Sequence, residues 1–433
     1  MLQRARALAV DVSPLRESVA FRALWGGQIV SLVGTHMRLV AVPFQVFAIT
    51  KSSAAVGLLG LAEVVPLILF SIAGGTLADS IDRRRIMGVA QVLLAADSAV
   101  LAALTLAGRP SLPWIYGLVA LAGALAAVDQ PARTAMIPSL VSSEHIPAAM
   151  ALRQVVFQTT HIAGPALGGL LIAALGGVGW LYVIDAATFA AALVTLRWVP
   201  PAKPRPSLAR PAEPRAPGAI REGLSYAFRT PLISSILVID LVAMIFGMPR
   251  AVFPALAEET FRAGAFGLGL LYAAPAGGAL ASALITGWVN RIRRNGIAIL
   301  IAVAIWGAAI TLAGLSLFSF PLTLAWLAVA GAADVVSAVF RGTMLIEATP
   351  DRLLGRVNAL NLMVVAGGPR LGDVEAGVVA ELVGAGPSVV IGGLASLLGT
   401  AGVAAGFRSL RVYRSKRDGA PGAAEDGVPR RLA

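Results

Sequence analysis

The 433-residue chain is strongly apolar, with 57% hydrophobic residues, 13% charged residues and a mean hydropathy of +0.80. Soluble domains carry about 25% charged residues, so the composition predicts a chain that crosses a bilayer many times. The absence of cysteine excludes disulfides, thiolate nucleophiles and cysteine-ligated metals. The net charge of +12 comes from arginines between apolar runs, without an aromatic-interleaved basic surface, and this pattern excludes nucleic acid as a partner.

Twelve stretches are long and apolar enough to span a membrane, which takes about 20 residues. No cleavable signal peptide is evident in Met1 to Glu17, so we expect the first span to act as its own targeting signal. The predicted spans are 21–48, 54–79, 86–107, 113–131, 148–175, 179–197, 232–257, 265–288, 296–317, 320–343, 356–383 and 386–408.

A polar segment at 199–230 separates the first six spans from the last six. Its prolines, from Pro200 to Pro217, are incompatible with a helix, so we expect an extended cytoplasmic linker. The predicted organisation is an N-terminal half (1–198), the linker (199–230), a C-terminal half (231–408) and a disordered basic tail (409–433).

The distribution of basic residues predicts that both termini are cytoplasmic. In that orientation the outward segments carry only Lys51, Arg109 and Arg262. The inward loops, besides the linker, carry Arg83, Arg84, Arg85, Arg133, Arg291, Arg293, Arg294, Arg341, Arg352 and Arg356.

The two halves match weakly at one offset. A shift of 208 residues places Arg133 on Arg341 and Gly164 on Gly372, and it also places Arg83 on Arg291. Coincidence in an Ala/Gly/Leu-rich chain is the alternative. We favour two pseudo-symmetric halves related by a parallel repeat, an arrangement that puts a transport site near mid-membrane between them.

The loop after the second span reads Gly-Gly-Thr-Leu-Ala-Asp-Ser-Ile-Asp-Arg-Arg-Arg, from Gly74 to Arg85, and resembles the signature of the major facilitator superfamily. The resemblance implies an all-α fold of twelve transmembrane helices. We expect this loop to act as a latch that breaks when the halves rock; the alternative is that its arginines only fix topology and bind lipid headgroups. The predicted gating residues are Gly75, Asp79, Asp82, Arg83, Arg84 and Arg85.

The fifth span contains Gly164-Pro165-Ala166-Leu167-Gly168-Gly169, which resembles the antiporter motif of exporters in this superfamily. Proline is expected to kink the helix, and Gly164, Gly168 and Gly169 allow close packing. A generic small-residue packing face is the alternative. Further stretches, such as Pro131 to Gly169 and Leu354-Gly355-Arg356-Val357-Asn358, resemble the branch that includes the enterobactin exporter and macrolide efflux proteins.

Several ionisable residues fall within predicted spans, where a charge costs about 3 kcal/mol or more and usually faces a cavity or a partner. The superfamily resemblance implies that the first, fourth, seventh and tenth helices line the cavity. The cavity candidates for substrate or proton binding are therefore Arg38, Asp240, Arg250 and Asp334. The other candidates at this depth are His36, Glu63, Asp97, His161, Asp185, Arg370, Asp373 and Glu375.

These side chains suggest two roles. Arg38 and Arg250 are suited to binding an anionic catecholate or carboxylate. Burial disfavours a charged carboxylate, so Asp240 or Asp334 is expected to bind a proton. Structural ion pairs between helices are the alternative at each position.

The sequence thus predicts a multi-pass protein of the bacterial inner membrane that exports a siderophore-like or other small organic molecule by proton antiport. Broad multidrug or macrolide efflux is the alternative. No nucleotide-binding loop, nucleophile elbow or metal-spaced histidine set is present, which argues against an enzyme or an ATP-driven pump. We expect no cofactor beyond the proton gradient. Of the possible oligomeric states we favour a monomer.

Overall fold

The computed structural model describes residues 11–202, 219–285 and 292–414, and these residues form helices joined by short connections. The N-terminal half contains α2 (Ser13–Glu17), α3 (Val19–Thr50), α4 (Ser53–Ser80), α5 (Arg83–Leu106), α6 (Leu112–Leu140), η1 (Ser143–His145), α7 (Ile146–Leu175), α8 (Gly179–Thr195) and η2 (Leu196–Trp198). The C-terminal half contains α9 (Ala219–Arg229), α10 (Pro231–Phe246), η3 (Arg250–Val252), α11 (Phe253–Ala255), η4 (Leu256–Thr260), α12 (Gly264–Ile285), α13 (Asn295–Leu315), α14 (Phe320–Ala348), α15 (Asp351–Val383), α16 (Ala385–Gly406) and α17 (Arg408–Val412).

Eleven helices within the described residues are long and apolar enough to cross a membrane. The 33-residue α15 is equally long but carries Arg370, Asp373 and Glu375 in its interior, so it falls outside that set by composition. Counting α15, the structure is consistent with the twelve predicted membrane helices.

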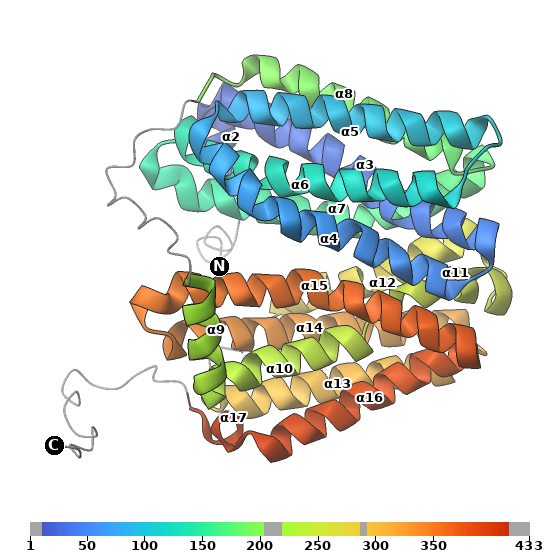
Figure 1. Cartoon of the computed structure of the whole chain (residues 1–433), viewed down its shortest axis with the longest axis vertical. Helices are drawn as coiled ribbons and strands as arrows, with labels where there is room; N and C mark the ends of the chain where they lie inside the picture. The colour runs from blue at the N-terminus through green and yellow to red at the C-terminus, as the bar shows by residue number, and fades with distance from the viewer. Residues whose placement is uncertain (1–10, 203–218, 286–291, 415–433) are drawn as a thin grey trace, which may run out of the picture.

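The two halves lie as two layers of roughly parallel helices, with α3 to α8 in one layer and α10 to α16 in the other (Figure 1). Helices alternate in direction, so that the α3–α4 connection at Lys51 lies at one end of the bundle and α9 lies at the other. We call these ends the Lys51 end and the α9 end. A single buried apolar cluster continues from one half into the other and includes Phe47 of α3 and Phe253 of α11.

The helix ends follow local capping rules. The Ser18 hydroxyl accepts a hydrogen bond from the Phe21 amide at the start of α3, and the Ser52 hydroxyl accepts one from the Ala55 amide at the start of α4. Such caps satisfy amides that have no partner within the helix. Lys51 adopts a left-handed conformation (φ 52°) between the two helices, which makes this connection tight.

The most extensive contacts between the halves are made by two pairs of helices, α4 with α15 and α7 with α12. α4 packs on α15 so closely that a Cβ on Gly57 would lie 2.4 Å from the Asp373 carbonyl oxygen, and one on Gly377 would lie 2.4 Å from the Ser53 carbonyl oxygen. α7 packs in the same way on α12. Small residues permit such backbone approach, so these positions fix the separation of the halves.

Polar contacts join the halves at the Lys51 end itself. Lys51 Nζ lies 2.6 Å from Glu258 Oε2, and the Ser52 hydroxyl donates a 3.0 Å hydrogen bond to Glu381 Oε2. The Lys51 end of the bundle is therefore held together across the two halves in this conformation.

Part of the linker is helical, although its prolines were predicted to exclude a helix from the whole segment. Residues 219–229 form α9, which begins after the last proline of the segment, Pro217. Glu222 of α9 pairs with Arg356 and, at 3.7 Å, with Arg352 of α15, so this helix is fastened to the α9 end of the C-terminal half. Linker residues 203–218, and most of the predicted tail, lie outside the described residues.

The fourth and seventh predicted spans differ most from the structure in their limits. The fourth was predicted to end at 131, but α6 continues through Pro131 and Pro138 to Leu140. The seventh was predicted as one helix over 232–257, but α10 ends at Phe246 and the chain continues as the short helices η3, α11 and η4. Gly247 and Pro249 lie in that break, and neither favours a continuous helix.

Candidate functional site

A cavity of about 190 Å³ lies between the two halves. Its N-terminal wall comes from α3, α4, α5, α6 and α8, and its C-terminal wall comes from Arg250, Ala251, Tyr272, Arg370 and Asp373. Of the four predicted cavity residues, Arg38 and Arg250 line this cavity, whereas Asp240 and Asp334 are not among its lining residues. Pockets for drug-sized ligands usually enclose about 300–1,000 Å³, so a molecule of that size requires the halves to separate further.

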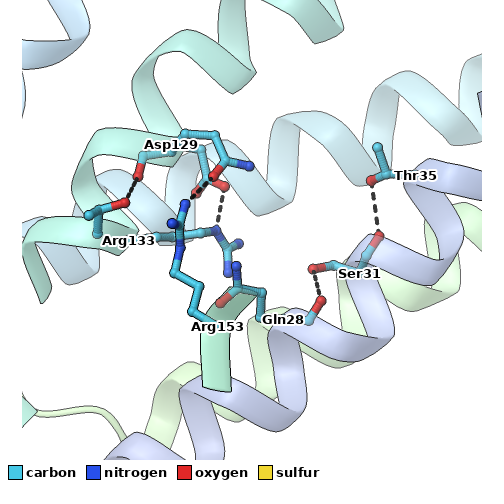
Figure 2. A network of polar contacts seen from close by, with 8 residues as sticks. Gln28, Ser31, Thr35, Asp129, Arg133 and Arg153 are labelled. Atoms are coloured by element: carbon cyan, nitrogen blue, oxygen red, sulfur yellow. Dashed lines mark hydrogen bonds and ion pairs between the residues drawn. The ribbon is translucent and has the colours of Figure 1, made fainter. Parts of the chain in front are cut away.

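One face of α3 supplies a polar stripe to the cavity. Gln28, Ser31, Thr35 and Arg38 follow each other at intervals of three or four residues, which places them on one side of the helix. The Ser31 hydroxyl donates to the Gln28 carbonyl oxygen at 3.3 Å and the Thr35 hydroxyl donates to the Ser31 carbonyl oxygen at 3.0 Å (Figure 2). Because these hydroxyls bond to their own helix, they remain available as acceptors toward the cavity.

α6 contributes a buried ion pair to the same cavity. Arg133 Nε donates to Asp129 Oδ2 at 2.5 Å, and Arg153 of α7 donates to Gln130 Oε1 at 3.4 Å (Figure 2). The sequence had placed Arg133 at a helix end and in an inward loop. Because α6 extends to Leu140, Arg133 instead lies inside the helix and is 5% exposed.

Arg38 belongs to a buried cluster in the N-terminal half. Its Nη1 lies 2.5 Å from Asp97 Oδ2 of α5 and 3.4 Å from the Ser98 hydroxyl. Ser98 in turn donates a 2.7 Å hydrogen bond to Asp185 Oδ2 of α8. Arg38 therefore has carboxylate neighbours within its own half, which the sequence did not reveal.

Asp240 and Asp334 share one partner in the C-terminal half. Arg341 Nη2 lies 3.0 Å from Asp240 Oδ1 and 3.5 Å from Asp334 Oδ1, and Arg341 Nη1 donates to the Ser337 hydroxyl at 3.0 Å. The sequence had assigned Arg341 to an inward loop. It lies inside α14 and is 5% exposed, so that assignment is wrong.

A third group of charges connects the halves. Arg370 of α15 lies 2.7 Å from Glu63 of α4, across the interface, and 3.7 Å from Asp373 of its own helix. Arg250, the second predicted cation, lies 3.9 Å from Asp373. Two arginines and two acids thus form a neutral network at the cavity wall.

The glycine-rich motif of α7 lies at the crossing of three helices. A Cβ on Gly164 would lie 2.3 Å from His36 Cβ of α3, and one on Gly168 would lie 3.0 Å from the Met37 carbonyl oxygen. Gly169 faces the other half, where its Cβ would lie 2.4 Å from the Ala265 carbonyl oxygen of α12. Pro165, next to Gly164, is buried within the helix. The motif therefore sets the approach of α7 to both α3 and α12.

The predicted gating loop lies at the α9 end. Asp82 caps α5, accepting a 2.8 Å hydrogen bond from the Arg84 amide, and Arg83 Nη1 donates to the Ala135 carbonyl oxygen of α6 at 2.9 Å. Arg85 is exposed. The side chains of Gly75 and Asp79 lie outside the described residues, as does Arg291, which the 208-residue shift matches to Arg83. The latch therefore stays a prediction.

Comparison with known proteins identifies the family. The model of the transmembrane secretion effector family matches residues 9–420. The chain belongs to this family of major facilitator superfamily exporters. Enterobactin exporters from Shigella boydii serotype 18 and Escherichia coli O1:K1 are each 31% identical over 354 residues, covering 81% of this chain and 83% of the relative. This transmembrane secretion effector is thus a multi-pass membrane transporter and not an enzyme.

Solved structures share the fold of this family member. A bacterial homolog of the human lysosomal transporter Spinster, in an inward-facing and unoccupied conformation, aligns with a TM-score of 0.72 at 15% identity, covering 93% of this chain and 99% of that one. A bacterial homologue of the iron transporter ferroportin, in an inward-facing state, aligns with a TM-score of 0.65 at 15% identity, covering 89% and 98%. The prediction of a twelve-helix major facilitator fold is confirmed.

Proposed function

We propose that the protein is a secondary exporter that moves a small, siderophore-like molecule out of the cell by alternating access, in exchange for protons. The observation that carries this proposal is a charged cavity between two halves that are joined at the Lys51 end. With the positive-inside orientation, the Lys51 end faces outward and the α9 end faces the cytoplasm. The conformation described here is then closed to the outside.

The chemistry of the cavity supports export of an organic molecule with polar groups. Four arginines and four acids line the cavity together with glutamine and hydroxyl side chains and an apolar wall that includes Leu39, Val42 and Phe189. Such a surface offers hydrogen bonds in both directions and apolar contact. The family relationship to enterobactin exporters makes a siderophore the first substrate to test.

Proton exchange is supported by the acids buried beside a single arginine. In the C-terminal half, Asp240 and Asp334 both pair with Arg341, so the two carboxyl groups share one ion-pair partner. Protonation of such a group couples to transport when it stabilises one conformation more than the other.

The experiment uses inside-out vesicles that contain the protein and are supplied with enterobactin. We expect enterobactin to accumulate when the vesicle lumen is acidic and to stop accumulating when a protonophore collapses the gradient. Accumulation that persists after collapse would exclude proton antiport. Accumulation of macrolides in place of enterobactin would favour the alternative of broad efflux.

The gating loop is tested by Asp79→Asn at matched expression. A latch residue holds one conformation, so its loss is expected to slow export, whereas export at the normal rate would count against the latch. Glu144→Gln, the same acid-to-amide change at an exposed position of η1 outside the loop, is the matched control for loss of a negative charge at this end of the bundle.

A further inference from the structure

The buried ion pairs of the described spans belong to four groups, which differ in their ratio of arginines to acids. Two groups are neutral: Arg133 with Asp129, and Arg250 and Arg370 with Glu63 and Asp373. The other two place one arginine against two acids: Arg38 with Asp97 and Asp185, and Arg341 with Asp240 and Asp334. Only the Arg38 group among these last two contributes residues to the cavity, namely Arg38 and Asp185.

The Arg38 group is almost inaccessible to solvent. Asp97 and Asp185 are 2% and 1% exposed. Asp97 Oδ2 contacts Arg38 and Asp185 Oδ2 accepts from Ser98, but the second oxygen of each carboxyl group, Oδ1, is buried without a hydrogen-bond partner. Each acid therefore has an oxygen free to carry a proton.

The group also lies deep within the helices. At 1.5 Å per residue, Asp185 lies about 9 Å from the first residue of α8 and Asp97 about 14 Å from the last residue of α5, both measured from the Lys51 end. The charged and titratable groups that face Asp185 are Arg38 from α3, Asp97 from α5 and Tyr182 from its own helix. The Tyr182 hydroxyl donates to Gln45 Oε1 at 2.8 Å and supplies no positive charge.

One negative charge would thus remain uncompensated if both acids were ionised. An isolated buried charge costs several kcal/mol even after the surrounding protein relaxes, and two neighbouring carboxylates favour the state in which they hold one proton between them. A single bound proton makes the group neutral.

We propose that Asp97 and Asp185 share one proton beside Arg38, and that this site links proton binding in the N-terminal half to the cavity through Asp185. The link to export rests on the proposed function, whereas proton binding by the group does not. The sequence had ranked Asp185 below Asp240 and Asp334; only Asp185 of these three lines the cavity described here.

The site also restricts the chemistry of the substrate. Exchange requires that proton and substrate compete, so the substrate group that reaches Asp185 must favour the ionised carboxylate. The ionised carboxylate is favoured by a substrate hydroxyl or phenol that donates a hydrogen bond to it, or by a substrate cation. The displaced proton then passes from the carboxyl group to water in the cavity. An anion at Arg38 would instead favour the protonated site and would move together with the proton.

Proton binding is tested by infrared difference spectroscopy of the full-length protein between acidic and alkaline pH, without substrate. The measurement is made in an Asp240→Asn background, which leaves Arg341 with one acid. We expect a signal from a protonated buried carboxyl group, and we expect Asp97→Asn and Asp185→Asn each to abolish it, because either change leaves Arg38 with one acid. Asp129→Asn, in a balanced pair, should retain the signal.

Loss of the signal in only one of the two variants, or in neither, would overturn the shared site. If one variant fails to fold, the other carries the test alone: loss of its signal supports the site and persistence overturns it.

Coupling is tested separately in proteoliposomes with enterobactin. Asp185→Asn is expected to retain exchange of labelled for unlabelled enterobactin while its gradient-driven accumulation falls to the level measured with a collapsed gradient. If enterobactin accumulation by the wild type does not depend on the proton gradient, the proposed antiport is wrong. Gradient-driven accumulation by Asp185→Asn equal to that of the wild type would defeat the role of this site alone.

Discussion

Gly57→Ala should shift the protein away from the conformation closed at the Lys51 end. A Cβ at Gly57 would lie 2.4 Å from the Asp373 carbonyl oxygen of the opposite half, a separation that forces the helices apart. Overpacking of this kind costs about 1–3 kcal/mol. If the halves separate at this end in the alternative conformation, the overpacking destabilises only the closed conformation. At RT ≈ 0.59 kcal/mol, the ratio of the open to the closed population then rises by about 5- to 160-fold.

A control in the same helix separates this effect from general destabilisation. A Cβ at Gly74 of α4 would lie 2.3 Å from the Ala127 carbonyl oxygen of α6, within one half. Gly74→Ala should therefore lower stability without altering the distance between the halves.

The assay is a distance measurement between two spin labels at the Lys51 end. The chain contains no cysteine, so Arg109→Cys and Arg262→Cys, at exposed positions of opposite halves, give a uniquely labelled pair. Gly57→Ala should increase the population with long distances and Gly74→Ala should not. Equal distance distributions in wild type and Gly57→Ala, or an equal shift in both variants, would refute the reasoning.

Three further substitutions have effects set by burial. Arg370→Gln leaves Glu63 and Asp373 without this partner and should lower the free energy of unfolding, as measured by chemical denaturation in detergent, by about 1–3 kcal/mol. This is less than for a fully buried pair, because 22% of the Arg370 side chain is exposed. If adding Glu63→Gln to this variant does not restore part of the lost free energy, the pairing is contradicted. Lys51→Ala removes an ion pair whose lysine side chain is 59% exposed, so the free energy of unfolding should fall by about 1 kcal/mol or less, and by still less at high salt concentration. A larger loss that does not depend on salt would mean that the contact is more than a surface ion pair. Asp82→Ala removes the N-terminal cap of α5 and should lower the free energy of unfolding by about 1 kcal/mol, whereas Asp82→Asn keeps a side-chain acceptor and should lower it by less. Equal losses for the two variants in the same denaturation assay would argue against capping.

The features repeated along the chain were predictable from the sequence. Apolar stretches of about 20 residues mark the membrane helices, and the motifs ending at Arg85 and Gly169 indicate the superfamily. These signals are local, so they do not depend on knowing which helices touch. α9 was missed because the prolines of the linker were extended to the whole segment, although they end at Pro217.

The pairing of charges between helices was not predictable, because these pairs join residues far apart in the chain. Arg38 meets Asp97 and, through Ser98, Asp185, and nothing in the spacing of these residues marks them as neighbours. Arg341 lies near the end of its predicted span and was assigned to the inward loop, and its contact with the distant Asp240 was likewise not visible in the sequence. Knowing the helix neighbours turns Arg38 from an expected substrate cation into the partner of two acids.

The central claim is that the cavity opens to one side of the membrane at a time. Thr35→Cys places the only cysteine of the chain at the cavity wall, where a membrane-impermeant thiol reagent can be added from either side of oriented vesicles. Introducing Gly57→Ala should raise the labelling rate from the Lys51 end and lower it from the α9 end. Rates that rise together from both sides would contradict alternating access.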